Sequence, residues 1–182
     1  MAVQSNHLNL GNKIIDFSLK GIDGNTHSPS EHDDKEVLVI MFICNHCPYV
    51  KAVIDRLTSL QHKHKDNAVQ FIAINSNDPD TYPEDSFENM KIFAEENNFN
   101  FPYVIDESQE VARAYDAQCT PDIYVYDKNR ILKYRGRIDD NWKEEDKVTS
   151  NELDRAIELL LEGKEIDFQQ IPSIGCSIKW KN

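Results

Sequence analysis

The sequence predicts a single α/β domain in which strands and helices alternate. Residues 37–43 (VLVIMFI) form a continuous apolar run rich in β-branched side chains, which is typical of a strand buried on both faces of a sheet. Residues 69–74 repeat this pattern, and apolar residues between the two runs recur at helical spacing. A strand, a helix and a strand in this order form a βαβ unit, so we expect two parallel strands joined by a right-handed crossover.

The length and the net charge of the chain indicate how many domains it has and which partners it disfavours. The chain has 182 residues, of which 40% are hydrophobic, and this favours one domain over residues 1–182, with residues 164–182 as a C-terminal tail. A formal net charge of -12 disfavours nucleic acids and anionic membranes as partners. The first residues show no secretory signal, and no apolar run approaches the roughly 20 residues of a membrane-spanning helix. We therefore expect a soluble cytoplasmic protein.

The segments around the βαβ unit predict the other elements. Residues 16–19 and 22–25 favour a small N-terminal hairpin with a tight Asp-Gly turn. Residues 76–85 (SNDPDTYPED) show neither the helical nor the strand spacing of apolar residues. They predict an exposed loop whose acidic groups aid solubility. Asp85 is expected to cap the helix that follows this loop.

The second half of the chain predicts a strand, a short helix, an antiparallel strand pair and a last helix. These elements are expected over residues 101–105, 108–115, 123–138 and 149–163. The antiparallel pairing follows from the short turn between its two strands. Thr149-x-x-Glu152 has the form of a capping box for the last helix, and Gly163 is expected to end it.

Cys44 and Cys47 lie at the junction between the first buried strand and the helix after it. Unpaired backbone N–H groups and the positive end of the helix dipole stabilise a thiolate at such a position. We therefore expect a lowered pKa for Cys44, which would act as the nucleophile on a disulfide or a peroxide. Cys47, one helical turn away, would resolve the mixed intermediate. The spacing thus predicts a Cys-x-x-Cys redox centre.

Two neighbours of the cysteines bear on this chemistry. His46, if protonated, would stabilise the thiolate further and make the couple more oxidising. The alternative is a solvent-exposed histidine without a role. Pro48 suits the first turn of the helix, where its missing N–H costs little.

The same thiols permit two other interpretations. Cys44 and Cys47 could be buried structural cysteines, although packing does not require a strand-to-helix junction. With His46 they could instead hold a soft ion such as Cu(I) or Zn(II), as in a metal-binding or metallochaperone module. A closed metal site would need a further ligand, and Cys119 and Cys176 are the only other thiols.

Several motifs resemble those of one protein superfamily. They are Leu10-Gly11 and residues 15–17 (IDF), 44–50 (CNHCPYV), 119–122 (CTPD), 134–136 (YRG) and 172–176 (PSIGC). Together they resemble the thioredoxin-fold superfamily, and more closely its redoxin branch, which is related to alkyl hydroperoxide reductase and the thiol-specific antioxidant proteins. The longer motifs are similar to a subgroup of bacterial thioredoxin-like redoxins. The resemblance implies a thioredoxin-like fold, with a central mixed sheet flanked by helices. The residues of this chain add the N-terminal hairpin extension and an irregular C-terminal tail to that fold.

The resemblance also implies a site and a reaction. Pro121 would be cis and face the cysteine pair, so that Thr120 and Pro121, with Asn45, His46 and Pro48, would shape the substrate groove and tune the thiols. The implied activity is thiol-disulfide exchange through the disulfide of the pair, with no other cofactor and no metal. Electrons would come from a thioredoxin or glutathione-type donor. The substrate would be a protein disulfide or a peroxide, and a peroxide would indicate an antioxidant role.

Two positions depart from the family pattern. Peroxiredoxins carry Thr or Ser three residues before the peroxidatic cysteine, where this chain has Cys44 before Cys47, and this disfavours peroxidase activity. Thioredoxin carries a buried acidic residue six positions before its first cysteine, where this chain has Leu38. An Asp or Glu from another strand could supply that carboxylate instead.

The other two cysteines have two alternative roles. Cys119 precedes Pro121 by two residues, and Cys176 lies in a tail that can fold back. They could form a second dithiol that exchanges electrons with the first pair. The alternative is that they are packed thiols or a structural link.

The remaining charged residues of interest are expected at the surface. Arg135 and Arg137 flank a glycine at a strand end, and we expect both on a solvated face, with contact to a substrate carboxylate as the alternative. Asp139 and Asp140 are expected to act as solubilising charges.

Overall fold

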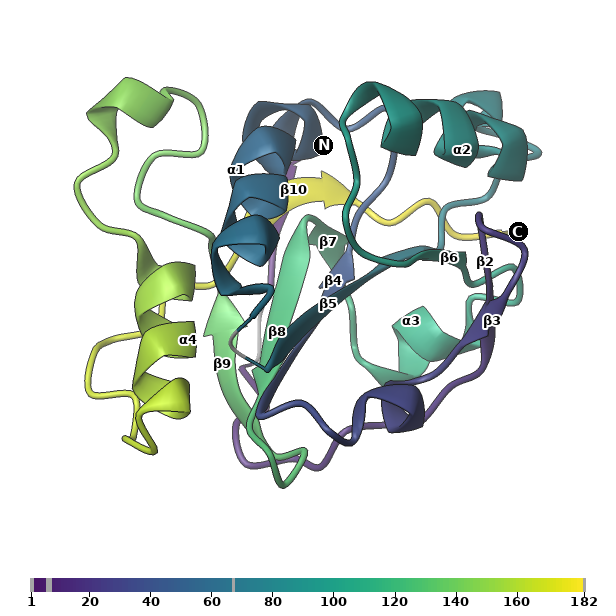
Figure 1. Cartoon of the computed structure of the whole chain (residues 1–182). Coiled ribbons are helices and arrows are strands. Elements are labelled where there is room, and N and C mark those ends of the chain that lie inside the picture. Colours follow the sequence, from purple (N-terminus) through teal and green to yellow (C-terminus); the bar gives the residue numbers. More distant parts are fainter. Residues whose placement is uncertain (1, 6–7, 67, 182) are drawn as a thin grey trace.

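The structure is a computed structural model that describes residues 2–5, 8–66 and 68–181 (Figure 1). The strands are β1 (Ala2–Gln4), β2 (Leu19–Gly21), β3 (Thr26–His27), β4 (Val37–Phe42), β5 (Val69–Asn75), β6 (Tyr103–Ile105), β7 (Cys119–Thr120), β8 (Asp122–Tyr126), β9 (Leu132–Gly136) and β10 (Ile174–Ser177). The helices are α1 (Pro48–His64), α2 (Phe87–Glu96), α3 (Glu110–Ala114) and α4 (Glu152–Leu161), with short 3-10 turns η1 (Pro29–His32), η2 (Pro83–Asp85) and η3 (Glu145–Lys147). Among the described residues, no helix combines the length and the apolar character needed to cross a membrane.

A seven-stranded mixed sheet forms the centre of the molecule, in the order β3-β2-β6-β5-β4-β8-β9 (Figure 1). β4 lies parallel to β5, and α1 connects them, so the predicted βαβ unit is confirmed. β8 pairs antiparallel with both β4 and β9, as the short turn after β8 predicts. The expected α/β class, with a mixed sheet flanked by helices, is therefore confirmed.

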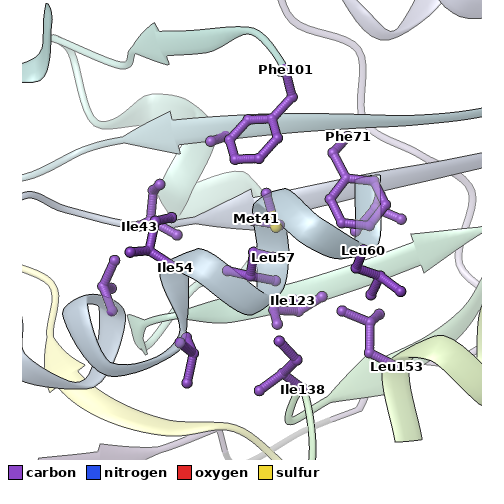
Figure 2. Packing of buried hydrophobic residues seen from close by; sticks show 14 of the residues in the cluster. Met41, Ile43, Ile54, Leu57, Leu60, Phe71, Phe101, Ile123, Ile138 and Leu153 are labelled. Carbon is purple, nitrogen blue, oxygen red and sulfur yellow. The ribbon is translucent and has the colours of Figure 1, made fainter. Parts of the chain in front are cut away.

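Alternate side chains of β4 fill two different cores, because successive residues of a strand point to opposite faces. Met41 faces the core that α1, α2 and α4 cover, where Ile54 and Leu57 of α1 pack (Figure 2). Ile40 faces the other core, which contains Tyr115 next to α3. All six residues of β4 are buried, which confirms the prediction from their continuous apolar run. This buried strand ends two residues before Cys44.

Two helix starts differ from their predictions. The side chain of Ser86, rather than that of Asp85, caps α2 by accepting a backbone N–H of the first turn. Asp85 turns inward instead. The predicted capping box of α4 is also wrong, since Asn151 is the N-cap and Thr149 donates its N–H and hydroxyl to the carboxylate of Asp140. Asp85 contacts Asn45 and His46 instead of its own helix, and Thr149 contacts Asp140, so neither side chain is available to cap the helix that follows it.

The two ends of the chain both contribute strands. β2 and β3 form the expected N-terminal hairpin, a few residues later than predicted, with Gly24 at a φ of +86° in its turn. The C-terminal tail, which was expected to be irregular, contains β10. This strand lies antiparallel between β1 and β7 in a second, three-stranded sheet. The tail therefore reaches β7, the strand just before Pro121.

Two charged residues that were expected at the surface are buried. The side chain of Arg135 is 0% exposed and pairs with the equally buried Asp122 at 2.9 Å. Asp139 is buried beside the guanidinium of Arg56. Arg137 is partly exposed and pairs with Glu152 at 2.6 Å. The surface predictions for Arg135 and Asp139 were wrong because their charge partners lie far away in the sequence.

Candidate active site

The cysteine pair lies where β4 ends and α1 begins. Cys47 is the N-cap of α1, and Pro48 occupies the first turn, as predicted. Both Cys44 and Cys47 are free thiols with 0% exposure. A hydrogen bond between the two sulfurs shifts the pKa of each thiol. The two cysteines are therefore in direct contact and buried.

Thr120 touches both sulfurs of the pair. Its Oγ1 lies 3.3 Å from Cys44 Sγ, and its carbonyl oxygen lies 3.1 Å from Cys47 Sγ, where a protonated thiol would donate to it. The Thr120-Pro121 peptide bond is cis. The structure thus brings together two motifs that are about 75 residues apart in the sequence.

The two thiols have opposite pKa shifts. The hydrogen bond with Cys44 is the largest cause of the lowered pKa of Cys47, which falls to about 4 despite burial. Three other groups lower this pKa further, namely the Cys176 thiol, the Thr120 hydroxyl and the backbone N–H of Val50. The hydrogen bond to Cys47, burial and the negative charge of Asp85 raise the pKa of Cys44. The prediction of a lowered pKa for Cys44 was therefore wrong. Cys47, not Cys44, is the N-cap of α1, so it is the cysteine next to the unpaired N–H groups of the first helical turn.

Asp85 organises the loop between the two cysteines. Its buried carboxylate accepts the N–H of Asn45 at 2.8 Å, Nδ1–H of His46 at 2.7 Å and the side-chain amide of Asn77 at 2.7 Å. Together with Cys44 Sγ and His46, a carboxylate oxygen of Asp85 belongs to a cluster whose atoms all lie within 4.8 Å of one another. The prediction of an exposed, solubilising loop is wrong for this residue.

The neighbours of the cysteines are held in different ways. The Asn45 side chain donates to the Glu84 carbonyl at 2.9 Å and accepts from the Tyr103 hydroxyl at 2.9 Å. It therefore supports the loop from inside and does not line a groove. The His46 ring is partly exposed and stacks on Tyr82, with ring centroids 5.5 Å apart.

The cluster of Cys44, His46 and Asp85 differs from the metal ligands considered above, because Asp85 replaces Cys47. Atoms of His46 and Asp85 that would bind a metal already take part in hydrogen bonds. Nδ1 of His46 donates to Asp85, and both carboxylate oxygens accept hydrogen bonds from other groups. Nδ1 of His46 and both carboxylate oxygens of Asp85 are thus hydrogen-bonded, as buried polar groups generally are.

Cys119 and Cys176 lie on opposite faces of the small sheet. Residues directly opposite in neighbouring strands share a face, and the pairs here are Cys119 with Ser177 and Thr120 with Cys176. Cys119 is buried, and burial raises its pKa. Cys176, in contrast, lies on the face of Thr120, and a hydrogen bond with Cys47 raises its pKa. The arrangement does not support a Cys119-Cys176 dithiol, and it brings a third thiol to the predicted redox pair.

A cavity of about 180 Å³ lies beside Pro121. Its lining includes Tyr49 at the start of α1, Trp142 and Pro172. The Tyr49 and Trp142 rings lie 4.2 Å apart between centroids and form one apolar wall. This is the position expected for a groove shaped by Pro121.

The comparison with known families agrees with this geometry. Residues 10–135 match the model of the AhpC/TSA family. The chain belongs to the AhpC/TSA family. It is similar to the thiol-disulfide oxidoreductase ResA of Geobacillus kaustophilus, with 27% identity over 124 residues, which cover 68% of this chain and 67% of that relative.

Solved structures confirm the thioredoxin-like fold. An uncharacterized conserved protein from Geobacillus kaustophilus has 48% identity and a TM-score of 0.94, covering 100% of this chain and 97% of that one. A hypothetical protein from Sinorhizobium meliloti 1021 has 38% identity and a TM-score of 0.94, with 98% of each chain covered. The thioredoxin domain of a thiol-disulfide oxidoreductase from Bacteroides vulgatus shares the fold at 15% identity and a TM-score of 0.66, covering 84% of this chain and 97% of that one.

Proposed function

We propose that this member of the AhpC/TSA family is a thiol-disulfide oxidoreductase whose redox centre is the Cys44-Cys47 pair. The observation that carries the proposal is that both buried sulfurs lie against Thr120, with Cys44 Sγ 3.3 Å from its Oγ1 and Cys47 Sγ 3.1 Å from its carbonyl oxygen, at the start of α1. A thiolate is the species that attacks a disulfide, and a thiol in contact with it can close the second bond. The similarity to proteins named thiol-disulfide oxidoreductases supports this chemistry.

The proposed reaction moves two electrons from the pair to the substrate. The Cys47 thiolate attacks one sulfur of the substrate disulfide, forms a mixed disulfide and releases the other sulfur as a thiolate, which takes up a proton. Cys44 then loses its proton and attacks Cys47 Sγ. The Cys44-Cys47 disulfide forms, and the second substrate thiol leaves. Run in reverse, the same steps oxidise a substrate dithiol.

Asp85 is the group that we propose as acceptor of the Cys44 proton. A carboxylate oxygen of Asp85 lies within 4.8 Å of Cys44 Sγ, and the carboxylate is buried. Its negative charge raises the pKa of Cys44, so that this thiol keeps its proton until the attack. Asp85 thereby supplies the acidic group that Leu38 does not provide in the strand.

Electrons would reach the oxidised pair from a thioredoxin or glutathione-type donor in the cytoplasm, with no further cofactor. The standard potential of the couple, measured against glutathione, distinguishes a reductant from an oxidant. A protein disulfide is the proposed substrate. Peroxide reduction has less support, because Cys44 occupies the position of the peroxide-binding Thr or Ser of peroxiredoxins.

Reduction of the insulin disulfides, with dithiothreitol as the electron source, tests the proposal. We expect the wild-type protein to accelerate the reaction, and both Cys44→Ser and Cys47→Ser to abolish that acceleration. Cys119→Ser is the matched control, since its sulfur contacts backbone carbonyls of Pro121 and Ser173. Full activity in either single variant of the pair would contradict the proposal. A parallel assay of peroxide consumption measures the peroxidase alternative.

A further inference from the structure

The strand β10 lies directly on the segment before Pro121. It pairs antiparallel with β7, and Cys176 is opposite Thr120. A Cβ atom on Gly175 would lie 2.0 Å from the Thr120 carbonyl oxygen, so this close approach requires glycine. β10 therefore occupies the backbone position at which an extended substrate could pair with Thr120.

The side chain that β10 presents to the redox pair is a thiol. Cys176 lies opposite Thr120, whose carbonyl oxygen is 3.1 Å from Cys47 Sγ, and a hydrogen bond between Cys176 and Cys47 raises the pKa of Cys176. It packs against the core cluster that contains both cysteines and remains partly exposed. Cys47 is thus in contact with two thiols, one from the Cys-x-x-Cys loop and one from the C-terminal tail.

We propose that Cys176 is a third redox-active thiol, which exchanges a disulfide bond with Cys47. The inference rests on the proposed function, because it starts from the Cys44-Cys47 disulfide. Cys176 loses its proton and attacks Cys47 Sγ. The Cys47-Cys176 bond forms as the Cys44-Cys47 bond breaks, and Cys44 leaves with the electron pair and takes up a proton. One disulfide and one thiol are present before and after the step, so no external oxidant or reductant is needed.

The electrostatics favour this step in the oxidised protein. In the reduced protein, burial, followed by the hydrogen bond to Cys47 and its negative charge, raises the pKa of Cys176 to about 11. The Cys44-Cys47 disulfide removes the negative charge on Cys47, so burial is then the main cause that raises the pKa of Cys176. Since β10 holds the attacking sulfur in place, the exchange is intramolecular and benefits from a high effective concentration.

In this arrangement the tail acts as an internal substrate. A protein substrate would have to displace β10 from Thr120 before its own sulfur could reach Cys47, which is 0% exposed. Transfer of the disulfide to Cys176 would also leave Cys44 as a free thiol. The exchange therefore couples the position of the tail to the oxidation state of the pair.

Disulfide trapping in Cys44→Ser tests the inference, because Cys47 can no longer bond to its first partner. The variant is oxidised with diamide at low protein concentration, quenched in acid, alkylated, digested and examined by mass spectrometry. We expect a monomer with a Cys47-Cys176 disulfide. Cys44→Ser/Cys119→Ser should form the same bond, and Cys44→Ser/Cys176→Ser should form no intramolecular disulfide.

A Cys44→Ser monomer in which Cys47 and Cys176 both remain alkylatable would overturn the inference, and so would a Cys47-Cys119 bond. The proposed function fails by a different readout, namely absence of the Cys44-Cys47 bond in the oxidised wild-type protein. The two results are independent, because trapping in Cys44→Ser does not need a functional pair. In oxidised wild-type protein, rapid acid quenching should reveal both bonds, and Cys176→Ser should retain only Cys44-Cys47.

Discussion

Two buried sulfurs lie against Thr120 at the centre of this site. The pKa of Cys44 is raised and that of Cys47 is lowered, and Cys47 is also the N-cap of α1. Hydrogen bonds to the charged form of a group favour that form, and so the negative charge resides on Cys47. The reactivity of the pair should therefore depend on the donors around Cys47 more than on the position of Cys44 in the motif.

The first prediction concerns the titration of Cys47. In the reduced wild-type protein, thiolate absorbance should appear as the pH rises through about 4. Cys44→Ala removes the largest stabilising donor, so the pKa of Cys47 should rise toward the ordinary value of 9.0. Cys119→Ala is the control and should leave the low transition in place. A low transition that survives Cys47→Ala would assign the thiolate to another sulfur.

The second prediction concerns Asp85 as the proton acceptor. Asp85→Asn conserves the shape but removes the charge, so closure of the mixed disulfide at neutral pH should slow by about 10²-fold, the scale of general base catalysis. The rate should recover as the pH rises, because hydroxide then removes the Cys44 proton. Stopped-flow measurement of the resolving step across pH checks this. If the rate of the resolving step in Asp85→Asn were lower by the same factor at every pH, Asp85 would have a structural role instead.

Several site residues could be predicted from sequence, and others could not. Cys44 and Cys47 stand out because a buried strand directly precedes them, a local pattern. Asp85 gives no such signal, since its stretch of Asp and Pro resembles any exposed loop and its partners lie about 40 residues away. The proximity of Cys176 to Cys47 depends on how the tail folds back, which its own residues do not show.

At the scale of elements, the prediction followed hydrophobic periodicity closely. β4, α1 and β5 agree with the expected βαβ unit because burial on defined faces fixes their periods. β10 was missed because its four residues, IGCS, have neither a long apolar run nor a clear alternation. What makes it a strand is pairing with β1 and β7, which is a tertiary property.

The third prediction tests the fit of β10 against β7. Gly175→Ala would place a Cβ against the Thr120 backbone, so the strand must shift and stability should fall by about 1–3 kcal/mol, the range for overpacking. Cys176 should then be alkylated faster than in the wild-type protein. Ile174→Ala, at an exposed position of the same strand, is the control. Equal alkylation rates for the wild-type protein and Gly175→Ala would show that the close approach does not hold the strand.

At the scale of the whole molecule, one buried ion pair joins the two sheets. Arg135 on β9 pairs with Asp122 of β8 at 2.9 Å and donates to the Ser5 hydroxyl at 2.8 Å, just after β1. Its guanidinium also lies over the Tyr124 ring, 4.5 Å from the centroid. Asp122 directly follows Pro121, so this network fixes the segment that contacts both cysteines.

The fourth prediction follows from the burial of this pair. Arg135→Met leaves the Asp122 carboxylate buried without its main partner, and unfolding by urea should show a loss of about 3–5 kcal/mol. Arg155→Met is the matched control, because Arg155 forms an exposed pair with Asp167 and such pairs contribute about 0–1 kcal/mol. Adding Asp122→Asn to Arg135→Met removes the orphaned charge and should restore part of the loss. If both arginine variants lose equal stability, the buried pair does not join the sheets, and the position of Thr120 must depend on the strand pairing of β7 with β10 alone.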